Sequence, residues 1–114
     1  MIVAIALSLD GTAGQGWGRA PRVAIARVED GRIESWDEHD VRWDALHDEG
    51  TEGGHHARIA RFLQEQRVET VVAGHMGPPM VQTLGRMHIE VRLAADGDPR
   101  AAAIAATEPP SPAG

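Results

Sequence analysis

The chain has 114 residues, no cysteine and a formal net charge of −6 at neutral pH. This length fits one domain with a normal hydrophobic core and leaves no room for a second domain. Without cysteine there are neither disulfides nor thiolate ligands, so protein ligands to a metal would have to be histidine or carboxylate. The negative charge, and the lack of a basic stripe interleaved with aromatic residues, argue against nucleic-acid binding.

The chain opens with an apolar run at residues 2–9, which predicts a central β-strand. The run has no basic flank and is too short for a signal peptide or a membrane span, so we expect a cytoplasmic protein without a membrane partner. A glycine-rich stretch follows at residues 10–18. It predicts a loop that either cradles a ligand with its backbone N–H groups or simply connects two strands.

Two strands joined by a tight turn come next. Residues 22–28 are largely apolar and predict a second strand, and the sequence Glu-Asp-Gly-Arg at 29–32 is a strong hairpin signal. The third strand, residues 33–39, carries alternating charges, which suit an exposed edge because they discourage further pairing. These two strands are therefore expected to be antiparallel.

Residues 40–54 are acidic and show no helical periodicity, so they predict a long loop, which is either functional or disordered. This loop carries Trp43, His47 and the pair Gly53-Gly54. The first clear helix is expected at 55–66, with His56 heading its apolar stripe. His56 is therefore expected to be packed, while His55 should point toward the mouth of the helix.

A β-branched run at 68–73 predicts a strand buried on both faces, which stops at Gly74. Pro78 and Pro79 predict the start of a helix that carries Met80, Val81, Leu84 and Met87 inward. In such a turn, free N–H groups and the helix dipole favour an anion, and His75 stands there. The alternative is that Gly74 and Gly77 only permit positive φ and that His75 is a solvated loop residue.

The C-terminal part predicts one more strand and one more helix. Residues 89–93 alternate as an edge strand, and Asp98 caps a helix that begins at Pro99. We expect the folded domain to span residues 1–106 and the proline-rich residues 107–114 to form a disordered tail.

This order of elements predicts an α/β fold with a five-stranded mixed sheet and helices on both faces. Because the crossover from strand three to strand four is right-handed, strand four can lie parallel beside strand one, giving the order 3-2-1-4-5 with strand two antiparallel. The loops at 10–18, 47–55 and 74–78 then converge at one edge of the sheet. We expect any site to be there.

Four short motifs, in this order, resemble the dinitrogenase iron-molybdenum cofactor biosynthesis family. They are Gly18-Arg-Ala-Pro21, Val28-Glu-Asp-Gly31, Gly53-Gly54-His55 and Val71-Val-Ala-Gly-His-Met-Gly-Pro78. The resemblance covers about residues 1–106 and implies a ribonuclease-H-like fold and non-enzymatic binding of an anionic metal-sulfur cluster. Where members often read His-Phe-Gly, this chain reads Gly16-Trp17-Gly18, so that histidine is absent.

The converging loops and these motifs give one set of candidate cofactor-binding residues: Asp10, Gly18, Arg19, Gly54, His55, Gly74, His75 and Gly77. His75 and His55 are the candidate metal ligands. The expected cofactor is an iron-sulfur or iron-molybdenum-type cluster, and the expected partner is a protein that donates or accepts it.

Two other classes of function stay open. The first is an interaction or regulatory module that kept the fold and lost the ligand. The second is a metal-dependent nuclease or hydrolase, but Asp10 has no converging carboxylate partners, so we expect no enzyme. The acidic residues at 37–40 and 44–48 have the composition of a metal cluster, although a solvated acidic loop produces the same letters.

Overall fold

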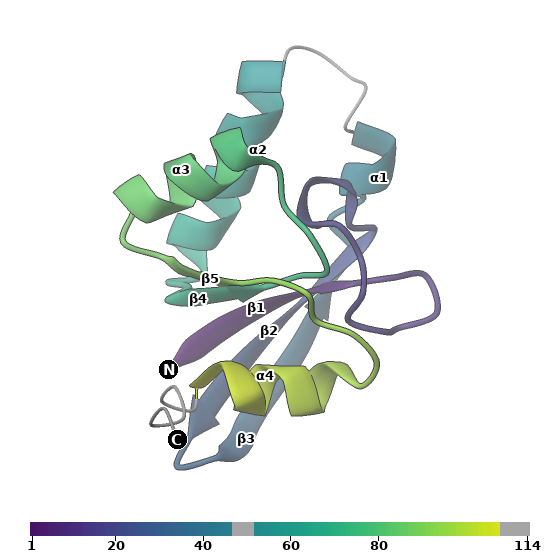
Figure 1. The fold of residues 1–114 in the computed structure, drawn as a ribbon, viewed down its shortest axis with the longest axis vertical. Helices are drawn as coiled ribbons and strands as arrows, with labels where there is room; N and C mark the ends of the chain where they lie inside the picture. The colour runs from purple at the N-terminus through teal and green to yellow at the C-terminus, as the bar shows by residue number, and fades with distance from the viewer. Residues whose placement is uncertain (47–51, 108–114) are drawn as a thin grey trace.

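A computed structural model describes residues 1–46 and 52–107 of the chain, and it contains one five-stranded sheet (Figure 1). The strands are β1 (Ile2–Leu7), β2 (Arg22–Glu29), β3 (Arg32–His39), β4 (Thr70–Val72) and β5 (Glu90–Arg92). Their order is β3-β2-β1-β4-β5. β2 is antiparallel to both of its neighbours, whereas β1, β4 and β5 are mutually parallel. The predicted strand order and directions are thus confirmed.

The β2–β3 hairpin closes as its sequence predicts. Asp30 and Gly31 occupy the turn with φ of 52° and 73°. Positive φ at both central residues is the requirement of the turn whose twist matches that of paired strands. The two strands are therefore connected without strain, and β3 lies at the edge of the sheet.

Helices cover both faces of the sheet, as predicted. They are α1 (Trp43–Leu46), α2 (Glu52–Glu65), α3 (Pro78–Arg86) and α4 (Pro99–Thr107), with a short 3-10 turn, η1 (Trp17–Arg19). In Figure 1, α2 and α3 lie over one face and α4 over the other. Alternate residues of β1 accordingly belong to two buried clusters, with Ala4 and Ala6 beneath α2 and α3 and with Val3, Ile5 and Leu7 beneath α4.

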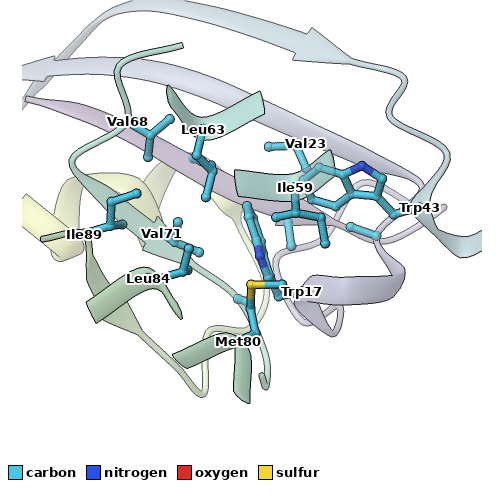
Figure 2. Close-up of a cluster of buried hydrophobic side chains, with 14 of the residues drawn as sticks. Trp17, Val23, Trp43, Ile59, Leu63, Val68, Val71, Met80, Leu84 and Ile89 are labelled. Carbon is cyan, nitrogen blue, oxygen red and sulfur yellow. The ribbon is translucent and has the colours of Figure 1, made fainter. Parts of the chain in front are cut away.

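The larger cluster holds the two buried tryptophans (Figure 2). Trp17 is fully buried and meets Trp43 edge-on at 5.1 Å between ring centroids, and Trp43 meets Phe62 at 5.7 Å. Ile59 and Leu63 of α2 pack into the same cluster. This packing ties η1, α1 and α2 together at the end of the sheet where the predicted loops converge.

The starts of α3 and α4 agree with the sequence. Gly77 is the N-cap of α3, and prolines fill the first two helical positions. Asp98 accepts a hydrogen bond from the backbone N–H of Arg100 at 3.1 Å, which caps α4. Residue 107, expected in the tail, is the last residue of α4.

Two expectations about the middle of the chain were wrong. Residues 43–46 form α1 rather than loop, and α2 begins at residue 52 rather than near 55. His47, Asp48 and the rest of 47–51 lie outside the described residues, as does the predicted tail at 108–114. Among the described helices, none is long and apolar enough to cross a membrane.

Candidate functional site

The loops that follow β1 and β4 join through their backbones. Gly16 and His75 form an isolated parallel bridge. The backbone N–H of Trp17 donates to the carbonyl of His75 at 3.0 Å, and the N–H of Gly74 donates to the carbonyl of Gln15 at 2.9 Å. Two of the three loops predicted to converge therefore do so, while most of the third lies outside the described residues.

Gly74 permits this close approach. A Cβ at residue 74 would lie 2.1 Å from the carbonyl oxygen of Gly14, which is far inside any acceptable contact. The positive-φ glycines in the described chain are Gly11, Gly31 and Gly97. The interpretation that Gly74 and Gly77 serve to permit positive φ is therefore wrong, and Gly74 is needed for space.

A pocket of about 320 Å³ opens where these two loops meet. Its lining residues are Gln15, Gly16, Trp17, Gly18, Arg19, His75, Met76 and Gly77. No carboxylate is among these described lining residues, although the chain carries 17 acidic residues. Arg19 and His75 are both exposed, and Arg19 makes no ion pair with any described residue. The pocket therefore offers positive charge in an otherwise acidic protein.

The backbone donors of the pocket lie before α3, not within it. Prolines at the first two positions of α3 have no N–H, and the N–H of Met80 already bonds to the carbonyl of Gly77 at 3.1 Å. By contrast, the N–H groups of Met76 and Gly77 have no acceptor among the described residues. An anion would thus be received by the turn, while the dipole of α3 adds a favourable field.

The expectation that His55 points toward the mouth of the helix was wrong. Its side chain is buried, at 3% exposure. Its Nε2 is 2.9 Å from the carbonyl oxygen of Gly18, and its Nδ1 is 2.9 Å from a guanidinium nitrogen of Arg58. Since a carbonyl can only accept and a guanidinium can only donate, Nε2 carries the proton and Nδ1 accepts. Both nitrogens are engaged, so in this conformation His55 braces η1 against α2 and is not placed as a ligand. His56 is half-buried.

The structure does not bring Asp10 or Gly54 to the pocket. The carboxylate of Asp10 accepts hydrogen bonds from the backbone N–H of Thr12 at 3.1 Å and from its hydroxyl at 2.8 Å. These bonds lower the pKa of Asp10 below its usual range. Gly54 lines a different surface hollow on α2, together with Arg58 and Phe62.

Four lining residues were not among the candidates: Gln15, Gly16, Trp17 and Met76. Trp17 forms the floor of the pocket as part of the hydrophobic core. Its ring is fully buried, and its indole N–H has no partner among the described residues. One feature of the sequence could have drawn attention to Gly16: members of the family that the chain resembles often have histidine at this position. Glycine there departs from the pattern at the point where the two loops touch.

The described residues do not form a conventional metal site. Within residues 1–46 and 52–107, no three His, Asp or Glu side chains come together in a group that could hold an ion. The acidic residues 37–40 therefore form no metal cluster among the described residues. A cluster that arrives with its own sulfides needs fewer protein ligands, and among the described side chains that line the pocket His75 offers an imidazole for one.

The comparisons with known proteins identify a family and, separately, a shared fold. The family described as "Dinitrogenase iron-molybdenum cofactor" matches residues 1–108. The crystal structure of a protein designated PH0822 has a TM-score of 0.71 at 16% identity, covering 93% of this chain and 88% of that one. A provisionally assigned dinitrogenase from Methanocaldococcus jannaschii has a TM-score of 0.59 at 17% identity, covering 86% and 79%. No curated protein matches the sequence.

At these identities the two structures show a shared fold only. The family match, in contrast, spans nearly the whole chain and includes every strand and helix described above. This chain therefore belongs to the dinitrogenase iron-molybdenum cofactor family.

Proposed function

We propose that this protein is a small non-enzymatic carrier that binds an anionic iron-sulfur or iron-molybdenum-type cluster, or a precursor of one, as cargo. The observation that carries the proposal is the pocket between Gln15 and Gly77, whose described lining includes Arg19 and His75 and no carboxylate, in a chain of this family. A protein that donates or accepts the cluster would be its partner.

The charges of the pocket favour an anion over a cation. The net charge of the whole chain is −6, so most of its charged side chains would repel an anion. The described part of its lining has no carboxylate, and the guanidinium of Arg19 and the backbone N–H groups of Met76 and Gly77 are all donors. Charge-assisted and backbone donors of this kind are what an anionic ligand needs.

His75 supplies the side chain that would ligate iron. Its imidazole is exposed, and neither ring nitrogen makes a hydrogen bond with any described residue. Its position is nevertheless fixed, because it sits between the buried end of β4 and the N-cap of α3. With no cysteine in the chain, one imidazole and the pocket's donors would hold the cargo loosely enough to release it.

Anaerobic reconstitution with ferrous iron and sulfide tests the proposal. We expect the purified protein to retain iron near one cluster per chain with a visible sulfide-to-iron absorption. We expect His75→Ala and Arg19→Ala each to reduce the retained iron, with no change in thermal stability. A colourless parent protein without bound iron would instead support the ligand-free interaction module.

A further inference from the structure

The backbone of Gly16 does not explain why a glycine stands there. Its φ and ψ of −65° and 138° lie in the extended region that any residue adopts. Gly16 is nevertheless buried, although it has no side chain and lies in a surface loop. Another group must therefore cover it.

That group is the imidazole of His75. A Cβ on residue 16 would lie 2.4 Å from Cε1, 2.6 Å from Nε2 and 3.2 Å from Nδ1 of the ring. Favourable contacts between carbon atoms need about 3.5–4.0 Å, so a side chain at position 16 and the ring in this place exclude each other. The backbones cannot separate easily, because the bridge between the two residues and the hydrogen bonds beside it hold them together.

No hydrogen bond or ion pair with a described residue orients this ring. Neither of its nitrogens forms a hydrogen bond with a described residue, and His75 as a whole is exposed. Contact with the bare Cα of Gly16 is therefore what holds the imidazole against the wall of the pocket. An exposed histidine without such a contact would sample several rotamers. Binding would then lose side-chain conformational entropy, which lowers the affinity.

We propose that Gly16 is the positioning residue of the pocket: it holds the His75 imidazole in one orientation and so determines whether an anionic metal cluster is retained. The inference rests on the proposed function. In this inference a glycine stands at residue 16 to make room for the ring of His75, and not because the loop around residue 16 needs the conformational freedom of glycine. Alanine at residue 16 should push the ring away from the wall while leaving the fold in place, because the exposed ring is free to move.

Gly16→Ala is the test, with Gly85→Ala as the matched control, since a Cβ at residue 85 of α3 would meet nothing within 4 Å. In the parent protein, NMR should show a nuclear Overhauser effect between the ring protons of His75 and the α-protons of Gly16. We expect Gly16→Ala to abolish this contact to residue 16 and to weaken iron retention after reconstitution by about 10- to 100-fold, the range seen when the support of a metal ligand is removed. Gly85→Ala should retain iron like the parent.

A double-mutant cycle separates positioning from a general effect on the fold. If Gly16 acts through His75, then His75→Ala added to Gly16→Ala should cause no further loss of iron, and melting temperatures should stay close to that of the parent. The inference is overturned if Gly16→Ala retains iron as the parent does, or if the ring contact is absent from the parent protein. A parent protein that shows the ring contact but retains no iron contradicts the proposed function instead.

Discussion

Replacing His55 distinguishes a structural brace from a ligand. His55→Ala removes the donor to the carbonyl of Gly18 and the acceptor for Arg58, and it empties a site that is 3% exposed. Leaving the half-buried carbonyl of Gly18 without its donor, together with the lost packing of the buried ring, should cost about 2–3 kcal/mol, whereas the exposed Arg58 can be hydrated instead. For a domain of this size about 4 °C of melting temperature corresponds to each kcal/mol, so we expect a fall of about 10 °C.

The assay is thermal unfolding followed by circular dichroism, run beside anaerobic iron retention. His55→Gln should recover much of the stability, because the amide of glutamine can donate to Gly18 in place of Nε2. His88→Asn serves as the control, since residue 88 is exposed at a φ of 60° that asparagine tolerates. The reasoning is refuted if His55→Ala and His55→Gln keep the parent's melting temperature but lose iron equally, since His55 would then be a ligand.

Three further predictions follow from the same structure. His75→Ala should lower iron retention by about 10- to 100-fold at an unchanged melting temperature, whereas His88→Asn should leave retention unaltered, both read from iron analysis after reconstitution. Gly74→Ala should destabilise the domain by about 2–4 kcal/mol in denaturant titration, because its Cβ would meet the Gly14 carbonyl at 2.1 Å. Asp10→Ala should lower the melting temperature at neutral pH. Since the folded pKa of Asp10 is depressed, its stabilisation exists above the ordinary carboxyl pKa and is lost as the pH falls through the folded value, so parent and variant should converge in acid.

The strand order could be predicted because strong local signals and one topological rule were sufficient. The hairpin sequence at 29–32 predicts the pairing of β2 and β3. The apolar runs of β1 and β4 can be buried on both faces only in the middle of a sheet. Handedness of the crossover then placed β4 beside β1. Each step depended on residues whose burial follows from their composition alone.

The direction of His55 could not be predicted because the helical pattern left two phases open. Residues 55, 59 and 63 are spaced four apart and all face inward, yet a stripe that began at His56 satisfied the same apolar positions. One residue rotates a side chain by about 100° around the helix, so this ambiguity reverses inside and outside. The observed phase is accompanied by a hydrogen bond from His55 to the Gly18 carbonyl, 37 residues away in the sequence, which no local pattern reveals.

The burial of Trp17 and Trp43 escaped prediction for a different reason. Trp17 stands between two glycines in a stretch that reads as loop, and α1 is a single turn, too short to show a period. Each ring is buried because it meets the other at 5.1 Å, a contact that links segments with no local pattern of their own. Long-range aromatic packing of this kind is invisible to reading along the chain.

The location of the pocket follows from the mixed pairing of β1. Because β1 runs parallel to β4, the loops that leave both strands emerge at the same edge of the sheet. Because β1 is antiparallel to β2, the chain must return from that edge to begin β2, and residues 8–21 cross it on the way. The returning segment carries Gly16 past His75, so close that a Cβ at residue 16 would displace the His75 ring. The place of the pocket is thus a product of strand order, and we propose that Gly16 at this crossing determines how the His75 imidazole is oriented.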